Sequence, residues 1–207
     1  MPAVAAAGLA AALFLAPSNA VPPTGGGPPT GGGSTAVVPS LVPSTAGSPS
    51  ATAVARKPVP PLAAAPTAVS IAAADLNVRV LPLTPTADDL ASESLVPPLT
   101  LDAYWLTSYG VPGAGSANTT YIVGHSWDGR DAPFNRLSDE SLVGKAVTVT
   151  TAKGALKYVV DSVTTHDKNT LKDSDIWNVV PNRVVLISCY TEDPWGKNVV
   201  VTASPAP

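Results

Sequence analysis

The sequence is poor in cysteine and has no cluster of basic residues, and each shortage excludes something. One cysteine, Cys189, occurs among 207 residues, so the chain cannot form an intramolecular disulfide. Its thiol is therefore either a small buried side chain or a reactive group. Twelve Lys and Arg stand against 15 Asp and Glu, and no run of basic residues would follow a phosphate backbone. Nucleic acid is not an expected partner.

Residues 1–66 have few of the large side chains that build a core. They hold 13 of the 23 prolines and only two charged residues, Arg56 and Lys57. Such a segment cannot offset the entropy lost on ordering. We interpret residues 21–66 as a disordered Pro/Gly/Ser/Thr-rich linker, either a tether to a membrane or a dispensable arm. Residues 67–207 are long enough for one compact domain.

Residues 3–16 form an uncharged apolar run. The run is shorter than a membrane span, which needs about 20 apolar residues, and it suits the apolar core of a signal peptide. Ser18–Ala20 resembles a small-residue cleavage site, although no basic residue precedes the run. We interpret residues 1–20 as an export signal or signal-anchor, with Ala-rich low complexity as the alternative. The expected location is extracytoplasmic, membrane-associated or secreted.

From Val69 onward, short runs rich in Val, Ile, Thr and Tyr alternate with turn signals, which is typical of β-strands. Residues 120–124 and 184–188 are nearly continuous apolar runs, which predicts central strands buried on both faces. Helical signals are weak and are confined to 88–92, 133–137 and 173–177. The pattern predicts an all-β protein, a closed or partly closed β-barrel of seven to eight strands with short helices. The predicted strands are 69–73, 78–81, 120–124, 146–151, 157–164, 183–188 and 199–203.

Cys189 and His125 each follow one of these apolar strands. A strand end that opens into a loop is where a rigid scaffold presents a reactive group. Cys189 alone is equally well explained as a buried thiol, and a lone histidine is more often structural. The pair suits a thiolate nucleophile with a partner for proton transfer, which indicates a cysteine acyl-transfer enzyme. His166 lies in a polar stretch that we interpret as a loop, and we expect it to be structural.

The residues around this pair resemble those of the sortase family. Tyr121-Ile-Val-Gly-His-Ser resembles the strand and Gly-His of the sortase histidine, and Val185-Leu-Ile-Ser-Cys resembles the TLxTC signature of the nucleophile. Phe134-Asn-Arg-Leu-Ser and Val199-Val-Val-Thr-Ala are similar to two further family segments in the same order. The resemblance covers about 69–203, and Leu95-Val-Pro-Pro-Leu is most similar to actinobacterial class F, then class E.

The resemblance implies a cysteine transpeptidase that needs no cofactor. Its expected substrate is an LPxTG-like sorting signal of a surface protein, and the acceptor is an amine of a peptidoglycan precursor or a pilin. A membrane is a further expected partner if the N-terminal segment is retained. The alternatives are a catalytically silent sortase-like domain that binds peptide or wall material, and an L,D-transpeptidase. The second family requires Ser-His-Gly-Cys close together, of which Ser188 alone is present before Cys189.

One residue of the family pattern is missing. Sortases carry an arginine at the start of the last strand, and no arginine follows Cys189. Asn198, or Lys197 if the loop is gapped by one residue, occupies the matching position and is the candidate for substrate and oxyanion binding. Alternatively, Arg130 or Arg136 reaches in from the loop after His125.

Two other groups of residues have simpler interpretations. Acidic residues near both strand ends lack the alternating pattern of a calcium loop, so we predict no metal: Asp128, Asp131, Glu192 and Asp193. Of the tryptophans, Trp105 and Trp177 are expected to pack against the barrel, while Trp127 and Trp195 are candidates to line a groove.

Overall fold

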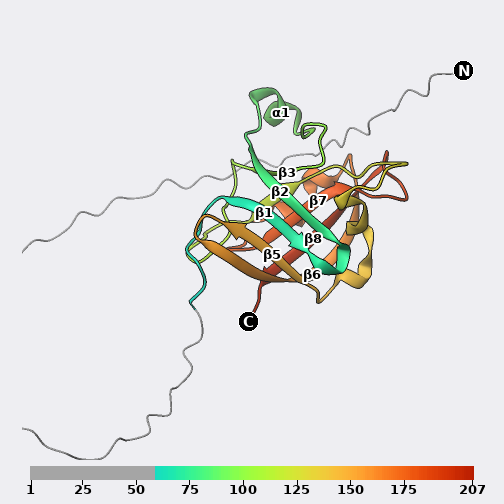
Figure 1. The fold of residues 1–207 in the computed structure, drawn as a ribbon. Helices are drawn as coiled ribbons and strands as arrows, with labels where there is room; N and C mark the ends of the chain where they lie inside the picture. Colours follow the sequence, from blue (N-terminus) through green and yellow to red (C-terminus); the bar gives the residue numbers. More distant parts are fainter. Residues whose placement is uncertain (1–58) are drawn as a thin grey trace, which may run out of the picture. The chain divides into compact units, whose positions relative to one another are not determined.

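The computed structural model describes residues 59–207. The predicted export signal (1–20) and most of the predicted linker (21–66) lie outside the described residues. Eight strands form a closed barrel in the order β1-β2-β3-β4-β7-β8-β6-β5, which confirms the predicted fold class (Figure 1). The strands are β1 (Pro66–Ile71), β2 (Leu76–Leu83), β3 (Ala103–Leu106), β4 (Thr120–Val123), β5 (Ala146–Thr151), β6 (Gly154–Asp167), β7 (Val184–Cys189) and β8 (Lys197–Pro205).

Two of the eight strand pairs are parallel, β2 with β3 and β4 with β7, and the other six are antiparallel. Parallel neighbours need a long crossover, and β2 and β3 are joined by residues 84–102, while the chain between β4 and β7 passes through β5 and β6 of the same barrel. The described helices are α1 (Ala87–Ser92) and five 3₁₀ turns, η1 (Ala72–Ala74), η2 (Pro133–Ser138), η3 (Glu140–Leu142), η4 (Leu171–Asp173) and η5 (Asp175–Trp177).

The barrel interior is filled by alternate residues of the strands, with β3 and β4 contributing one fully buried residue each, Ala103 and Ile122. Phe134 and Leu137 of η2 join this interior cluster. A second buried cluster lies on the outer face of β3, β4, β7 and β8, where Leu95 and residues of η4 and η5 cover the strands. Every residue of β4 and β7 is buried, which confirms the prediction of central strands covered on both faces.

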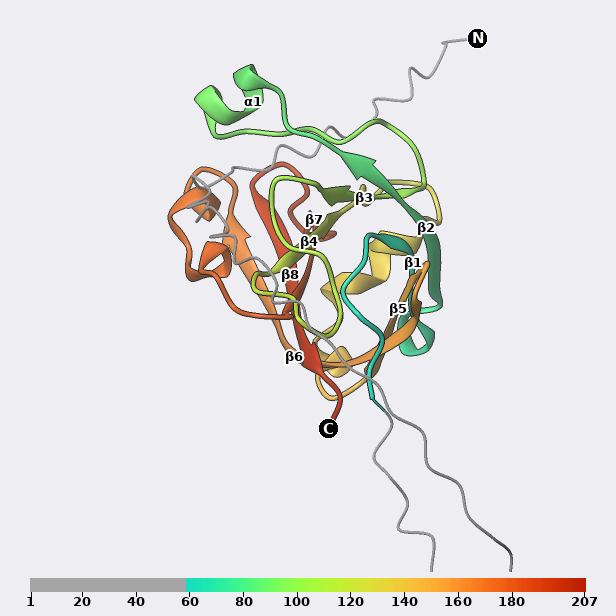
Figure 2. The ribbon, with the colours of Figure 1, turned by 90° about the vertical axis from the view of Figure 1, so that its left-hand side faces the viewer.

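The β2–β3 connection carries α1, which projects from the barrel (Figures 1 and 2). Its N-terminus is a capping box: Thr86 Oγ1 accepts a hydrogen bond from the Asp89 N–H at 3.1 Å, and the Asp89 carboxylate accepts one from the Thr86 N–H at 2.7 Å. The helix ends at Glu93, whose φ of 52° is left-handed, so the chain turns back toward the barrel. Leu95 then packs on the outer face and brings Pro97 over the end of β4.

Residues before β1 also pair with the barrel. The N–H groups of Ala63 and Ala64 donate to the carbonyls of Ala114 and Pro112 at 2.9 and 3.1 Å, and the Ala114 N–H donates to the Pro61 carbonyl at 2.8 Å. Gly113 allows this close approach, since a Cβ there would lie 2.8 Å from the Ala63 backbone. The chain from residue 61 onward is therefore hydrogen-bonded to the barrel.

Candidate active site

His125 and Cys189 occupy equivalent positions at the ends of two neighbouring parallel strands. Val123 of β4 is the register partner of Ile187 of β7, and the Gly124 N–H donates to the Ile187 carbonyl at 3.1 Å, which continues the ladder. His125 and Cys189 follow these partners by two residues. Because side chains alternate along a strand, both point to the outer face, like Val123 and Ile187. The register therefore places the two predicted residues on one face, at the ends of neighbouring strands.

Two buried serines on the opposite face hold these strand ends together. The Ser126 and Ser188 hydroxyl oxygens lie 2.8 Å apart. Ser188 donates to the Gly124 carbonyl at 2.9 Å, and Ser126 donates to the Cys189 carbonyl at 2.8 Å. Ser126 also lies 3.3 Å from the Phe134 carbonyl, so the two hydroxyl protons are shared among three carbonyls and the contact between the serines. The network fixes the backbone on which the histidine and the cysteine are carried.

Gly124 has a packing role beside the histidine. A Cβ at this position would lie 2.7 Å from the ring of Phe134, which is buried in the barrel interior. The Phe134 ring occupies the space that any side chain at residue 124 would need. The glycine before His125 is therefore explained by its contact with Phe134.

His125 is buried, with 2% of its surface exposed, and one ring nitrogen has a defined partner. Nε2 lies 2.9 Å from the carbonyl oxygen of Pro97 in the β2–β3 connection. A carbonyl only accepts, so Nε2 carries a proton. Nδ1 has no hydrogen-bond partner within the described residues. In the neutral ring Nδ1 is therefore the atom that holds a free lone pair and can take up a proton.

Cys189 is fully buried, and a lysine ammonium group lies beside its sulfur. Lys168 Nζ lies 3.5 Å from the Cys189 sulfur and donates to the Pro194 carbonyl at 2.7 Å. Burial raises the pKa of the Cys189 thiol above its ordinary value, while the nearby Lys168 charge and its hydrogen bond act in the opposite direction. Of the two alternatives that the sequence left open for the position of this thiol, the structure shows the buried one.

The two residues proposed in place of the family arginine lie at the start of β8. Asn198 is the register partner of Cys189 and is buried. Cross-strand partners share a face of the sheet, so Asn198 lies on the outer face with the sulfur. Lys197, one residue earlier, belongs to the opposite face by alternation.

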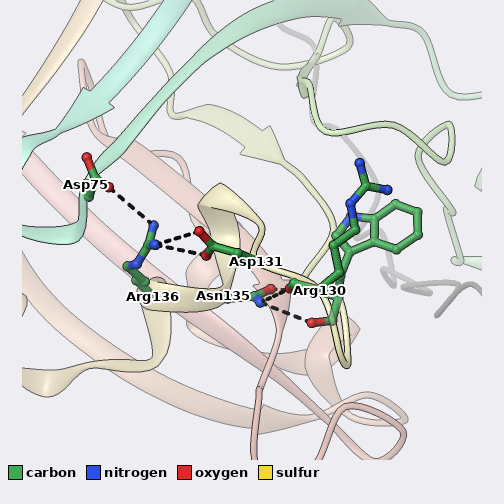
Figure 3. A network of polar contacts seen from close by, with 6 residues as sticks. Asp75, Arg130, Asp131, Asn135 and Arg136 are labelled. Atoms are coloured by element: carbon green, nitrogen blue, oxygen red, sulfur yellow. Dashed lines mark hydrogen bonds and ion pairs between the residues drawn. The ribbon is translucent and has the colours of Figure 1, made fainter.

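The two arginines after His125 are held by other groups (Figure 3). Arg136 bonds the Asp131 carboxylate at 2.8 Å and lies 3.9 Å from a carboxylate oxygen of Asp75. The Arg130 guanidinium stands over the Trp127 ring, 5.1 Å from its centroid. Asn135 holds this loop closed, because its amide donates to the carbonyls of Trp127 and Arg130 at 3.0 and 2.9 Å.

A hollow of about 260 Å³ lies between this loop and the turn after Cys189. Trp127 lines it together with Ser126, Asn135, Thr191 and Pro194, while Trp195 is 69% exposed outside it. Trp105 and Trp177 pack against the barrel, as expected from the sequence.

A larger hollow of about 590 Å³ lies beside β6 and is lined by polar side chains, including His166. The loop expected around His166 is wrong, since this residue belongs to β6 and faces Asn198 across the ladder. Burial lowers the pKa of His166, which favours its neutral form. Thr164 is its hydrogen-bond partner at 3.0 Å.

Sequence reasoning missed Lys168, Pro97 and the Ser126–Ser188 pair. Lys168 lies 21 residues before Cys189 in a polar stretch that reads as solvated surface. Pro97 bonds His125 through its backbone carbonyl, a group that every residue has, so the sequence gives no sign of this contact. The serines do have a signal, because each is adjacent to a site residue and lies on the buried side of its strand.

The fold and the site together define a class of protein, closed β-barrels with a cysteine and a histidine at the ends of two parallel strands. A model of the sortase domain matches residues 69–206, and the chain belongs to the sortase family, whose members are cysteine transpeptidases. Comparison with curated protein sequences finds no match.

Two solved structures illustrate the shared fold. Streptococcus agalactiae sortase C1, in complex with MTSET, is 16% identical, with a TM-score of 0.52 over 69% of this chain and 70% of that one. Sortase A from Corynebacterium diphtheriae is 19% identical, with a TM-score of 0.51 over 70% of this chain and 62% of that one. The chain thus spans about two thirds of the length of these relatives.

Among residues 59–207, which the structure describes, no helix is long and apolar enough to cross a membrane. The same residues form no group of three or more His, Cys, Asp or Glu side chains that could hold a metal ion.

Proposed function

We propose that this sortase cleaves an LPxTG-like sorting signal and transfers the acyl group to a cell-wall or pilin amine, with Cys189 as nucleophile and His125 as acid and base. The observation that carries this proposal is the placement of His125 and Cys189 on one face, at the ends of paired parallel strands. A proton donor for the leaving amine and a sulfur nucleophile must approach the same peptide bond, and this placement allows it.

The chemistry starts with transfer of the Cys189 proton to Nδ1 of His125, whose Nε2–H remains bonded to the Pro97 carbonyl. The sulfur then forms a bond to the carbonyl carbon of the sorting-signal Thr, and an electron pair moves onto the carbonyl oxygen. The C–N bond breaks as the glycine amine takes the proton from His125, which leaves a thioester. An acceptor amine then attacks the thioester carbon, its proton passes to Nδ1 of His125, and the C–S bond breaks to release the Cys189 thiolate.

The substrate reaches the sulfur only if the cover over Cys189 opens. The β2–β3 connection, through Leu95, and the β6–β7 connection, through η4 and η5, cover the outer face, and the Glu93 carboxylate of the first accepts a bond from Lys172 of the second at 2.6 Å. We propose that a sorting signal displaces part of this cover when it binds along β4 and β7.

Within the family, we assign the chain to class F, with class E as the second choice, on the Leu95–Leu99 segment. In this structure the segment has a defined place, because Leu95 packs on the outer face and Pro97 bonds His125. We place the enzyme outside the cytoplasm, membrane-associated or secreted, with residues 1–20 as export signal or signal-anchor.

The test is detection of the acyl-enzyme by mass spectrometry after incubation of the full chain with peptides that vary the LPxTG motif. The wild type should gain the mass of the acyl fragment at Cys189. Cys189→Ala should show neither adduct nor cleavage, and His125→Gln should lose cleavage. Turnover by Cys189→Ala would overturn the proposal.

A catalytically silent domain that binds peptide or wall material is the second candidate, and the complete burial of Cys189 favours it. Burial also raises the thiol pKa, so fewer molecules carry the thiolate at neutral pH. A silent domain would bind a sorting peptide with the same affinity in wild type and Cys189→Ala, and no acyl-enzyme would form with any peptide of the series.

A further inference from the structure

Lys168 is the first residue after β6, and the backbone holds it beside the nucleophile. Asp167 is the register partner of Lys197, and the Lys168 N–H donates to the Gly196 carbonyl at 2.9 Å, which adds one step to the β6–β8 ladder. His166 and Lys168 lie on the same face by alternation, and His166 pairs with Asn198, which pairs with Cys189 on β7. Lys168 therefore lies on the same face as Cys189, with β8 between their two strands.

The ammonium group of Lys168 is buried without a carboxylate. The residue is 9% exposed, and Nζ contacts the Cys189 sulfur at 3.5 Å and the Pro194 carbonyl at 2.7 Å. Within the described residues no carboxylate lies within ion-pair distance of Nζ. A buried charge that lacks an opposite charge is costly. The contact able to supply that charge is the thiol, once it has lost its proton.

We propose that Lys168 is a catalytic residue that provides the positive charge absent at the family arginine position. Its ammonium group holds the Cys189 thiolate, and then holds the negative charge that moves to the substrate carbonyl oxygen when the C–S bond forms. This inference rests on the transpeptidase function proposed above. The positive charge would then come from the β6–β7 connection, where Lys168 lies, and not from the start of β8, where sortases carry their arginine.

The position suits both steps. The carbonyl oxygen of the tetrahedral intermediate is bonded to the carbon that the sulfur attacks, so it forms within reach of a cation already in contact with that sulfur. The Pro194 carbonyl holds Nζ in place, so the ammonium needs no rearrangement as the charge moves from sulfur to oxygen. Burial strengthens the interaction with either atom, because the effective dielectric constant is lower than in water.

The thiol pKa gives a direct measure that needs no substrate. Cys189 is the only sulfur nucleophile in the chain, so the ultraviolet absorbance of the thiolate, taken as the difference from Cys189→Ser, follows its titration. Lys168 is the charged group that acts on this pKa. Other titratable groups at this end of the barrel are His125 after β4, His166 and Asp167 at the end of β6, and Tyr190, Glu192, Asp193 and Lys197 of the β7–β8 segment.

The test compares Lys168→Met, which keeps the length and removes the charge, with Lys168→Arg, which keeps the charge. The matched control is Lys157→Met on β6, an exposed lysine that bonds Thr148 Oγ1 at 2.7 Å. In Lys168→Met the Cys189 thiol should titrate at higher pH than in the wild type, and the acyl-enzyme should form about a hundredfold more slowly. Lys168→Arg should keep the wild-type midpoint and most of the rate, and Lys157→Met should match wild type in both.

Two results for Lys168→Met would overturn the role of Lys168. In the first, both the midpoint of the Cys189 thiol titration and the rate of acyl-enzyme formation are unchanged. In the second, the midpoint shifts but the rate of acyl-enzyme formation is unchanged. Thermal unfolding of each variant identifies any that is not folded. If Lys168→Met fails to fold, Lys168→Arg decides, and a large loss of rate with its folded state intact overturns the proposal. If the wild type acylates with no peptide while Lys168→Met still shifts the midpoint, the proposed transpeptidase function fails and the thiolate contact stands.

Discussion

The hydroxyl groups of Ser126 and Ser188 lie 2.8 Å apart, on the buried side of the two strand ends that carry His125 and Cys189. Each serine precedes or follows a site residue by one position, and each donates to a carbonyl of the other strand end. The pair therefore ties the acid/base residue to the nucleophile through the backbone, without contact with substrate.

We expect Ser188→Ala and Ser126→Ala each to lower the free energy of unfolding by about 1–3 kcal/mol, because each leaves a buried carbonyl without its donor. The double variant should lose less than the sum of the two, since both hydroxyls belong to one network. Denaturant unfolding of the four proteins measures the coupling. Strictly additive losses would show that the serines act independently.

Gly124→Ala should destabilise the protein by about 1–3 kcal/mol, as overpacking of a dense core does. The added methyl group meets the Phe134 ring, so the strand end beside His125 must shift and the acylation rate should fall as well. Phe134→Leu in the same chain should restore part of both losses, although Phe134→Leu alone is destabilising. If the double variant is no better than Gly124→Ala, the contact with Phe134 does not explain the glycine.

A chain that starts at residue 59 should keep the thermal stability and the peptide cleavage of the full chain in solution. A chain that starts at residue 67 should unfold at a lower temperature, because it loses the hydrogen bonds of residues 61–64 to the 112–114 segment. Thermal unfolding and cleavage of the two truncated chains test this. Equal stability of both would show that the 61–64 pairing contributes nothing measurable, and lost activity at residue 59 would contradict the interpretation of the linker.

Most of the fold was predictable because strand patterning is local. The run 146–151 coincides with β5, and 184–188 falls within β7, since β-branched residues gather there between turn signals. β3, at Ala103–Leu106, was missed. Four residues give too short a pattern, and this strand is defined by parallel pairing with β2 across a long connection. The three predicted helical segments all contain helical turns, whose starts are marked by Thr86 before α1, Pro133 in η2 and Ser174 before η5.

The site was predictable only where its residues lie on strands. His125 and Cys189 follow apolar runs, and the parallel register of those runs places them side by side. Lys168 was not predictable, because its place depends on how β6 and β8 pair beyond the last strand residue. The sequence left the burial of Cys189 open, since it depends on contacts such as that with Lys168 from another strand end. Such contacts are non-local and leave no periodic signal in the sequence.

Asn198 and Lys197 remain the sequence-based candidates for the oxyanion, and the register of β8 separates them. Asn198 shares the outer face with Cys189, whereas Lys197 belongs to the other face. If the Asn198 amide donates to the oxyanion beside the Lys168 ammonium, Asn198→Ala should lower kcat/KM by about a hundredfold, and Lys197→Ala should leave it near the wild-type value. Arg136→Ala should also have little effect on kcat/KM, because its guanidinium is bound to Asp131 and Asp75.

The Asn198 amide and the Lys168 ammonium would act on the same oxygen atom. The losses of kcat/KM in Asn198→Ala and Lys168→Met should therefore not be independent. The double variant Asn198→Ala with Lys168→Met then separates a shared role from two independent ones. A combined loss well below the product of the single losses indicates that both groups hold one oxyanion. If Lys197→Ala lowers kcat/KM and Asn198→Ala does not, the argument from the register of β8 fails. Lys197, the match when the loop is gapped by one residue, is then the residue that replaces the family arginine.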